Sequence, residues 1–517
     1  MTEYAIEMTE YAIELSGITK AFGPVVANNN VDLAVERGSI HGIVGENGAG
    51  KSTLMSILYG FYTPDTGTVS IMGKPLQLNS SQAAIEAGIG MVHQHFMLVD
   101  TFTVLENVIL GAEGGFSLDE PMAKAEARLK ELSEKYNLSV DPQAVVSTLP
   151  VGVQQRVEIL KALYRGADIL ILDEPTGVLT PQEADQLFEI MRNLKAQGVT
   201  IVLITHKLRE IMDITDNVSV MRLGEMVAHK PTTATSPEDL AELMVGRKVL
   251  LDIEKQAPKP GDVALNVDDL SLTDDRGVSR LKNVSFSVRR GEIVGIAGVS
   301  GNGQSQLLSA LSGMIPPTSG TISYGDRHIS ADAPSTPREV RDLNVAHVPE
   351  DRQKLGLVTA FEAWESSVLG YETRSENSGP ILMKNSDIHR EAQGMMDRFD
   401  VRPNNPRLGS AKFSGGNQQK LVLAREIEKQ PDVLLVGQPT RGVDIGAIEF
   451  IHKQIIAMRD AGKAVLLISV ELDEIMGLAD RILVMFDGEI VGEVSAEEAD
   501  ERTLGLMMAN AYQEDAA

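Results

Sequence analysis

The sequence predicts an α/β fold that is built twice in tandem, each copy with a mainly parallel sheet and a helical subdomain. Short apolar runs such as "GSIHGIVG" (38–45), "ADILILDEP" (167–175) and "VTIVLITH" (199–206) alternate with helical stretches. Runs of this length suit strands buried on both faces, which indicates a parallel sheet covered by helices. The chain has 517 residues, too many for one ordinary core, and its first half resembles its second.

Two segments of the first half recur in the second half in the same order. The segment "NVDLAVERGSIHGIVG" (30–45) returns as "NVSFSVRRGEIVGIAG" (283–298), and "MRLGEMV" (221–227) returns as "MFDGEIV" (485–491). The two members of the second pair are separated by more residues than the two members of the first pair. We therefore expect the second copy to carry a longer insertion in its middle.

The domain boundaries follow from these repeats. We expect a first domain over residues 1–246, a linker over 247–262 and a second domain over 263–517, because the linker segment has two prolines and mixed charge. Between residues 101 and 148 the pattern becomes helical, with "PMAKAEARLKELSEKYNL" (121–138) as a charged surface helix. This block predicts a separate helical subdomain.

Composition excludes several classes of function. The chain has no cysteine, which excludes disulfides, iron–sulfur clusters and thiolate zinc sites and leaves Mg²⁺ as the best-fitting metal. A net charge of −26 argues against a nucleic-acid-binding face, although a local basic groove would be compatible with it. No apolar run approaches a membrane span, and the acidic N-terminal segment does not resemble a signal peptide. We expect a cytoplasmic protein.

The run "GENGAGKST" matches the phosphate-loop pattern G-x-x-x-x-G-K-[ST] between a strand-like and a helical segment. Its glycines let backbone N–H groups surround phosphates, Lys51 reaches the β- and γ-phosphates, and the Ser52 hydroxyl can hold Mg²⁺. The residues of this loop that we expect to contact nucleotide are Gly45, Asn47, Gly48, Gly50, Lys51, Ser52 and Thr53.

Further polar groups follow the predicted strands. In "ILILDEPT", Asp173 can face Mg²⁺ and Glu174 a water; alone the pair would more often be a solvated strand end, but the phosphate loop upstream favours the site. Gln94 in "MVHQHF" and His206 in "VLITHKL" also lie at strand ends, where parallel sheets meet ligand. A lone histidine there is more often merely hydrogen-bonded. Phe22 in "KAFG" fits adenine stacking and core filling equally well.

These motifs resemble the nucleotide-binding subunits of ABC transporters, which are P-loop NTPases, and the resemblance covers nearly the whole chain twice. It implies ATP and Mg²⁺ as cofactors. It further implies that Glu174 is the general base, that Gln94 contacts Mg²⁺ and senses the membrane partner, and that His206 contacts the γ-phosphate.

The family's remaining signature, LSGGQ, opens a helix whose N-terminus holds the γ-phosphate of nucleotide bound by the other domain of a pair. The second half has a near match in "FSGGNQQ", with Ser414, Gly415 and Gly416. The first half has "LPVGVQQ", where Pro150 removes a hydroxyl and an N–H and Val151 adds a Cβ.

The second half has lost its own nucleotide motifs. Where the first half has the lysine, both carboxylates, the glutamine and the histidine, the second half has Gln304, Gly437, Gln438, Glu350 and Val470. All these losses fall on one composite site. The other site combines the first half's loop and carboxylates with the second half's signature and Asp444, which stands where the first half has Thr180. We expect intramolecular pairing of the halves and hydrolysis at this one site.

Fused halves with one degenerate site resemble the ATPase subunits of bacterial importers for sugars such as ribose and galactose and for nucleosides. The segment "GMVHQHFMLVDTFTVLENVILG" (90–111) resembles the nucleoside branch, which works with a membrane permease and an extracytoplasmic substrate-binding lipoprotein. The resemblance implies a peripheral position on the cytoplasmic side of the membrane. Soluble twin ATPases that act on ribosomes or in DNA repair remain an alternative. Those that act on ribosomes usually keep both sites and have a long charged linker, and this chain has neither.

Overall fold

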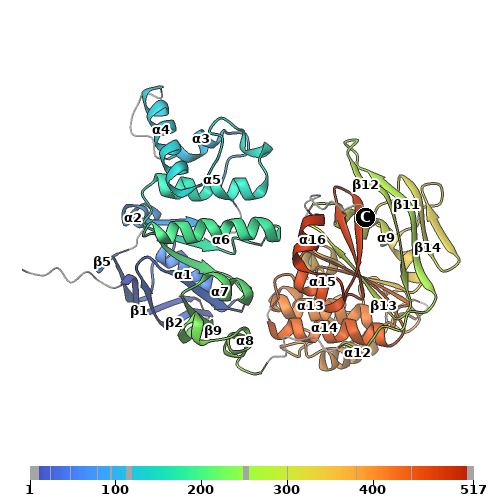
Figure 1. Cartoon of the computed structure of the whole chain (residues 1–517). Helices are drawn as coiled ribbons and strands as arrows, with labels where there is room; N and C mark the ends of the chain where they lie inside the picture. Colours follow the sequence, from blue (N-terminus) through green and yellow to red (C-terminus); the bar gives the residue numbers. More distant parts are fainter. Residues whose placement is uncertain are drawn as a thin grey trace, which may run out of the picture. The chain divides into compact units, whose positions relative to one another are not determined.

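The chain divides into two compact units, Met1–Val249 and Leu250–Ala517, and each is described by itself (Figure 1). The computed structural model describes residues 11–23, 25–46, 48–77, 80–93, 96–111, 119–177, 179–248, 255–299, 301–379, 381–443 and 445–508. Within these ranges no helix is both long and apolar enough to cross a membrane.

The first unit is built on a six-stranded sheet of order β10-β9-β3-β8-β7-β6. All neighbouring strands are parallel except the β9-β10 hairpin, as the apolar runs predict. The strands are β3 (Ile40–Gly45), β6 (Ile89–Val92), β7 (Ile169–Asp173), β8 (Thr200–Ile204), β9 (Asn217–Arg222) and β10 (Glu225–Pro231).

A second, antiparallel sheet of order β2-β1-β4-β5 belongs to the same unit, and the local sequence patterns do not predict it. Its strands are β1 (Tyr11–Phe22), β2 (Val25–Glu36), β4 (Thr66–Ile71) and β5 (Lys74–Leu76). Side chains of α1 pack in one apolar cluster with residues of both sheets. The antiparallel sheet therefore completes the core around the helix that follows the phosphate loop.

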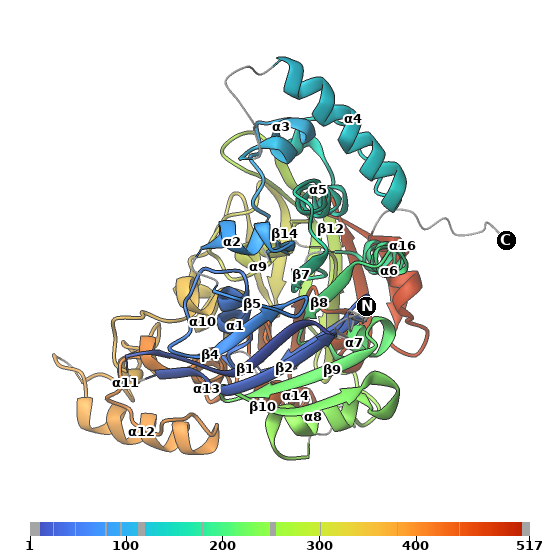
Figure 2. The ribbon, with the colours of Figure 1, turned by 90° about the vertical axis from the view of Figure 1, so that its left-hand side faces the viewer.

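Eight α-helices accompany these sheets among the described residues. Helices α3, α4 and α5 gather at one end of the unit, away from β1 and β2, and form the predicted helical subdomain with α4 as its surface helix (Figure 2). The helices are α1 (Lys51–Leu58), α2 (Ser81–Glu86), α3 (Val104–Ile109), α4 (Asp119–Tyr136), α5 (Val151–Tyr164), α6 (Pro181–Ala196), α7 (Leu208–Ile214) and α8 (Pro237–Val245), with 3-10 turns at Val146–Thr148 and Thr232–Ala234.

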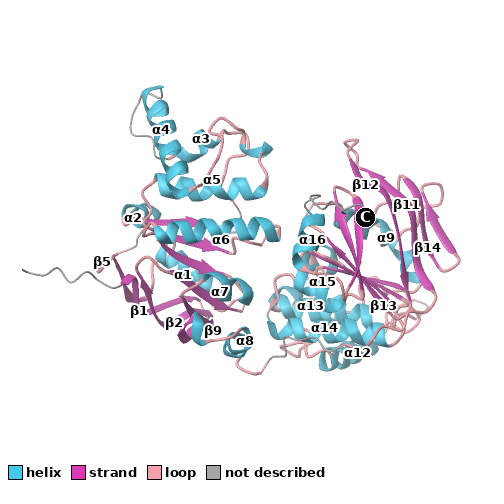
Figure 3. Ribbon diagram, in the orientation of Figure 1, coloured by secondary structure: helices cyan, strands magenta, loops and turns pink. Residues whose placement is uncertain are grey.

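The second unit repeats both sheets, with strand orders β16-β17-β18-β13-β19-β20 and β12-β11-β14-β15. One face of the six-stranded sheet packs on α13 to α16, and the other packs on α9 and the antiparallel sheet (Figure 3). The strands are β11 (Val263–Thr273), β12 (Ser279–Arg289), β13 (Glu292–Ala297), β14 (Ser319–Tyr324), β15 (Arg327–Ser330), β16 (Val345–Val348), β17 (Val433–Gly437), β18 (Ala464–Ser469), β19 (Arg481–Phe486) and β20 (Glu489–Ser495).

Most of the extra length of the second copy lies between β16 and α13, which confirms the longer middle. This stretch contains a π-helical turn at Arg352–Gly356. The helices of the unit are α9 (Gln304–Leu311), α10 (Pro337–Asp342), α11 (Ala363–Ser366), α12 (Asn385–Arg398), α13 (Gly415–Ile427), α14 (Ile445–Asp460), α15 (Leu472–Leu478) and α16 (Glu501–Met508), with a 3-10 turn at Ser410–Lys412.

A carboxylate anchors the start of the phosphate-loop strand in both units. Asp216 accepts the backbone N–H of Ile40, and Asp480 accepts that of Ile293, each at 2.9 Å. The cation beside each carboxylate differs. Lys195 and Asp216 form a pair whose side chains are 37% and 36% exposed, whereas Arg459 and Asp480 are 1% and 4% exposed.

Replacing Arg459 by alanine should lower the free energy of unfolding of the second unit by about 3 kcal/mol, because Asp480 would stay buried without its main cation. Trp364, the one tryptophan of the chain, lies in α11, so its fluorescence in urea reports on this unit. Lys195→Ala is the matched control, and calorimetry should show a change of at most about 1 kcal/mol, because exposed pairs contribute little. Equal losses in the two variants would contradict this difference.

Candidate nucleotide-binding site

The first phosphate loop connects β3 to α1 and has the backbone geometry that its glycines permit. Gly48 and Gly50 have φ of 84° and 102°, in the left-handed region. A Cβ on Gly50 would lie 2.3 Å from the carbonyl oxygen of Ala27, and one on Gly45 would lie 2.4 Å from that of Met221. The loop can therefore close around a ligand only with glycine at these positions.

The Lys51 ammonium lies inside this loop. Its side chain is almost fully buried, and Nζ donates to the carbonyl oxygens of Gly45 at 2.6 Å and Glu46 at 3.0 Å. Burial lowers the pKa of Lys51, while the carboxylates of Glu174 and Asp173 act to raise it. Ser52 and Thr53 follow in the first turn of α1. A buried cation in a glycine-rich loop at the start of a helix is suited to phosphate.

Asp173 and Glu174 lie at the carboxyl end of β7, as predicted. Burial, with a smaller contribution from Glu174, raises the pKa of Asp173 to about 6. Glu174 takes a left-handed backbone, with φ of 46°, and its N–H donates to Ile204 at the end of β8. This places the two carboxylates at the edge of the sheet where the loop lies.

His206 and Glu174 are brought together by the structure. The carboxylate Oε1 accepts a hydrogen bond from His206 Nδ1 at 2.8 Å. This hydrogen bond is the main cause that lowers the pKa of Glu174, with the charges of His206 and Lys51 contributing in the same direction. Glu174 is thus an ionised acceptor at neutral pH, as a general base must be.

Phe22 does not fill the core. Its side chain is 43% exposed and packs edge to face on Tyr62, with the ring centroids 5.1 Å apart. Lys20 Nζ lies 5.7 Å from the Phe22 centroid. The core alternative is therefore wrong, and an exposed aromatic pair remains available for stacking. Tyr62 was not expected from the sequence, because its contact with Phe22 joins distant segments.

The two signature segments differ at the start of their helices. Ser414 caps α13, and its hydroxyl accepts hydrogen bonds from the backbone N–H and side-chain amide of Asn417. A Cβ on Gly415 would lie 2.5 Å from Nη2 of Arg352, a residue that the sequence analysis did not single out. Pro150 precedes α5 without any side-chain cap. This difference agrees with the reading of an intact and an altered signature.

The second phosphate loop keeps the shape of the first without its charge. Gly301 and Gly303 have φ of 99° and 109°, and Gln304 begins α9 as Lys51 begins α1. The buried Gln304 amide donates to the carbonyl oxygen of Val299 at 3.1 Å. A neutral side chain thus occupies the place of the ammonium.

The surroundings of this second loop are also rebuilt. The Ser305 hydroxyl donates to the Glu350 carboxylate, and a Cβ on Gly437 would lie 2.5 Å from Leu308 Cδ2 and 2.7 Å from Glu350 Cγ. Gln438 keeps the left-handed backbone of Glu174, with φ of 48°. At the hairpin corresponding to that of Phe22, the second unit has Asp274, which pairs with Arg280. An acidic turn has replaced the aromatic ring.

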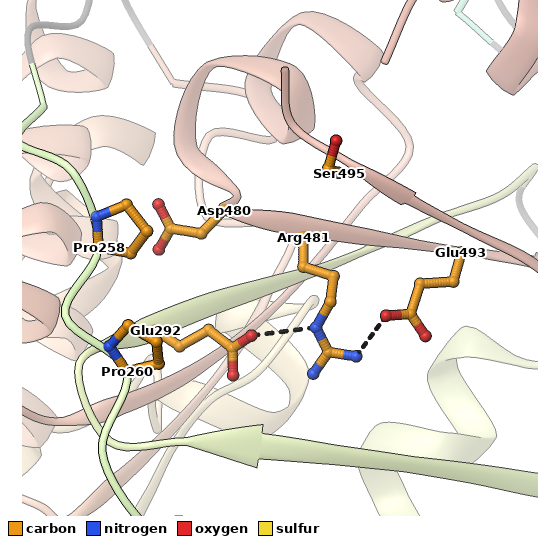
Figure 4. Close-up of a pocket in the computed structure, with 7 residues that line it drawn as sticks. All are labelled: Pro258, Pro260, Glu292, Asp480, Arg481, Glu493 and Ser495. Atoms are coloured by element: carbon orange, nitrogen blue, oxygen red, sulfur yellow. Dashed lines mark hydrogen bonds and ion pairs between the residues drawn. The ribbon is translucent and has the colours of Figure 1, made fainter. Parts of the chain in front are cut away.

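The second unit also has a pocket of about 460 Å³, and the residues of the second phosphate loop do not line it (Figure 4). Arg481 bridges Glu292 and Glu493 in it, at 3.0 and 2.9 Å. Glu292 is the first residue of β13, whereas the phosphate loop follows the last residue of that strand. Asp480 also lines the pocket and pairs with Arg459 at 2.9 Å. All four charged groups of the lining are therefore paired, and the pocket offers no open charge to a ligand.

Three predicted site residues, Asn47, Gln94 and Asp444, lie outside the described residues, and their roles stay predictions. Among the described residues no group of three or more His, Cys, Asp or Glu side chains is arranged to hold a metal ion. The oxygens of Ser52 and Asp173 nevertheless fit Mg²⁺, which usually takes only one or two carboxylates and completes its shell with phosphate and water. The raised pKa of Asp173 beside Glu174 marks a place where a cation would relieve repulsion.

Comparison with known proteins agrees with this geometry. The ABC transporter family model matches residues 28–177 and 281–441. The chain is 47% identical to the guanosine import ATP-binding protein NupO of Bacillus subtilis (strain 168), over 99% of both chains. It is 47% identical to the nucleoside import ATP-binding protein NupA of Lactococcus lactis subsp. cremoris (strain MG1363), over 96% of this chain and 97% of the relative.

A third relative, the glucose import ATP-binding protein TsgD13 of Haloferax volcanii (strain ATCC 29605), is 45% identical over 96% of this chain and 95% of its own length. Among solved structures, an archaeal ribosome recycling factor in complex with a ribosomal stalk protein aligns over 93% of this chain and 90% of its own, with a TM-score of 0.60. At 19% identity this likeness shows the fold alone. The chain belongs to the ABC transporter family, as an ATPase that carries two copies of the family's nucleotide-binding domain.

Proposed function

We propose that the protein is the ATP-hydrolysing subunit of a bacterial membrane importer for nucleosides and that it hydrolyses ATP at one site. The observation that carries the single site is the contrast between the two loops. Buried Lys51 lies near Asp173 and the Glu174–His206 pair, whereas Gln304 is neutral and its amide donates to the carbonyl oxygen of Val299. The cargo rests on NupO and NupA, both named for nucleoside import. Import of a sugar is the second candidate, because TsgD13 is almost as similar.

Each of the residues Lys51, Glu174 and His206 would have a separate role in hydrolysis. Lys51, held by two carbonyl oxygens of its loop, neutralises charge on the β- and γ-phosphates. Glu174 orients the attacking water and accepts its proton, since its pKa is held low by His206. His206 fixes the carboxylate at 2.8 Å and contacts the γ-phosphate from its other nitrogen. Mg²⁺, held by Ser52, Asp173 and Gln94, would supply a second positive charge to the phosphates.

The partners follow from the same assignment. An import ATPase requires a permease that provides the path through the membrane, and the nucleoside branch adds an extracytoplasmic substrate-binding lipoprotein. The protein would then act as a peripheral subunit on the cytoplasmic side. Within the chain, the helix that begins after Ser414 would complete the nucleotide site of the first half, with Gly415, Gly416 and Asp444 beside it.

Replacing Asp173 by asparagine tests the metal assignment through stability as well as binding. The raised pKa means that the folded carboxylate destabilises the ligand-free protein above pH 6, and that this effect is lost as Asp173 takes up a proton below pH 6. Asp173→Asn should therefore stabilise the first unit by about 1–2 kcal/mol at pH 8 and by about half as much at pH 5, where the unfolded carboxyl is still ionised.

Calorimetry of the nucleotide-free chain at the two pH values measures this effect. The same variant should lose the extra thermal stabilisation that MgATP gives over ATP with a chelator. A pH-independent difference, or unchanged stabilisation by MgATP, would contradict the assignment of Asp173.

Uptake of labelled cargo tests the proposed function as a whole. Cells of the source organism that lack this protein should lose uptake of guanosine and other nucleosides, and the wild-type gene should restore it. Glu174→Gln should not restore it. In the purified complex with the permease this variant should bind ATP yet turn it over at least 10²-fold more slowly, because general-base catalysis is usually worth at least that much. Loss of ribose, galactose or glucose uptake instead would favour the second candidate, and a Glu174→Gln rate above about a tenth of normal would refute the base role.

The unequal signatures are tested by a pair of substitutions in the assembled transporter. Ser414→Arg would fill the space beside the γ-phosphate of the working site while every residue of the first half stays unchanged. ATP binding should survive and the steady-state ATPase rate should fall at least about 10²-fold, as expected when a group aimed at transition-state charge is lost.

Pro150→Ser is the matched control for that experiment. It restores a capping hydroxyl to a signature that faces a site without its lysine, carboxylates and histidine. The rate should stay within about twofold of the wild type, because a cap is worth only about 1 kcal/mol of local stability. A severalfold increase with Pro150→Ser, or full activity with Ser414→Arg, would refute the assignment of the two signatures to separate sites.

A further inference from the structure

We infer that Glu210 is a positioning residue for hydrolysis, because its buried carboxylate holds together the two loops that carry Glu174 and His206. This inference rests on the proposed hydrolytic role of that pair. Glu210 itself lies in α7 and touches neither of these side chains through any hydrogen bond given by the structure.

The Glu210 carboxylate bridges two threonine hydroxyls. Thr205 Oγ1 donates to Oε2 at 3.0 Å, and Thr176 Oγ1 donates a short hydrogen bond to Oε1. All three side chains are buried, with Glu210 only 8% exposed. Lys207 Nζ lies 3.9 Å from Oε1 and provides the nearest positive charge. A charged group at this depth is stable only when its oxygens are paired in this way.

The two threonines stand next to the catalytic pair in sequence. Thr176 follows Glu174 by two residues, and Thr205 directly precedes His206. Thr205 Oγ1 also accepts the backbone N–H of Lys207 at 3.0 Å, so the hydroxyl fixes the turn that contains His206. The Glu210 carboxylate therefore holds the loop of Glu174 at a fixed distance from the loop of His206. These are the two loops whose side chains meet in the 2.8 Å contact between Glu174 and His206.

A second buried group fixes the same loop. Gln155 of α5 donates to the carbonyl oxygen of Pro175 at 2.8 Å, on the residue between Glu174 and Thr176. In the second half the corresponding residue is Gln419, whose buried side-chain nitrogen has no hydrogen-bond partner among the described residues. The loop after β7 is thus held at both of its inner residues, whereas the loop after β17 is not held by this amide.

The second half keeps the glutamate but directs it elsewhere. Glu474 of α15 is 5% exposed, and its Oε1 pairs with Nε2 of His452 in α14 at 2.9 Å. Its other oxygen has no hydrogen-bond partner within the described part of the chain. A hydroxyl remains at the position of Thr205, because Ser469 accepts the N–H of Glu471. The bridge is therefore absent where Val470 has replaced the histidine.

The residue that stands at the position of His452 in the first half accounts for the difference. His452 corresponds to Phe188 of α6, a buried ring that offers no hydrogen bond. With phenylalanine there, α6 offers the Glu210 carboxylate no hydrogen bond at this position, and the loop hydroxyls of Thr176 and Thr205 bind it. With histidine there, one oxygen of Glu474 pairs with α14 instead of with the loops. A single aromatic position thus determines whether the carboxylate serves the site.

Steady-state kinetics of the complex with its permease test the inference. Glu210→Ala and the isosteric Thr205→Val should each lower kcat about 10-fold or more, because small displacements of catalytic groups have effects of this size. The KM for ATP should stay within about twofold, because the Lys51 loop is untouched. Thr205→Ser, which keeps the hydroxyl, should retain most of the activity.

Glu474→Ala is the matched control, since it removes an equally buried carboxylate of the second half, and it should leave kcat within about twofold. Phe188→His should lower kcat by diverting Glu210 as His452 diverts Glu474. Equal losses in Glu210→Ala and Glu474→Ala, or full activity in Thr205→Val, would overturn the positioning role. Glu174→Gln in the same assay separates the two hypotheses. If this variant stays active, the proposed base role of Glu174 fails; if it is inactive while Thr205→Val is active, only this inference fails.

Discussion

The buried ammonium of Lys51 is the charge on which the first site depends. It is tolerated because two loop carbonyls accept its protons and because Asp173 and Glu174 lie nearby. The dependence is mutual, since two carboxylates at this depth would repel one another more strongly without the cation. The second half shows the consequence: lysine and both carboxylates are absent together, because the loss of one sign of charge makes the other sign unfavourable.

The shape of a phosphate loop is separable from its charge. Gly301 and Gly303 keep the left-handed backbone of Gly48 and Gly50, and the Gln304 amide takes over a carbonyl that an ammonium would otherwise bind. Folding of the loop thus requires glycine and one hydrogen-bond donor. Catalysis additionally requires a cation, a base and loops held at a fixed separation. Within the described part of the chain, these three features occur together around the first loop and not around the second.

Local patterns made much of this structure predictable. The strands of the parallel sheets, both phosphate loops and the strand-end position of Asp173 follow from contiguous sequence, and the relatives confirm the family. The antiparallel sheets, the packing of Phe22 on Tyr62 and the bonds of Glu210 did not follow, because each depends on contacts between distant segments. The neighbouring residues in the chain do not indicate that Phe22 is exposed and packs on Tyr62 whereas Phe188 is buried.

The tight packing around Gly437 makes it difficult for the second half to regain the motifs of the first. An aspartate there would press its first side-chain atom against Leu308 and Glu350, so reversion would require several neighbours to change first. Gln304→Lys alone would place a buried cation in a loop that lacks both strand-end carboxylates of the first half. Each single reversal is therefore disfavoured until the others are made. Single mutations would therefore not restore the second site, and the two halves are free to specialise separately within one chain.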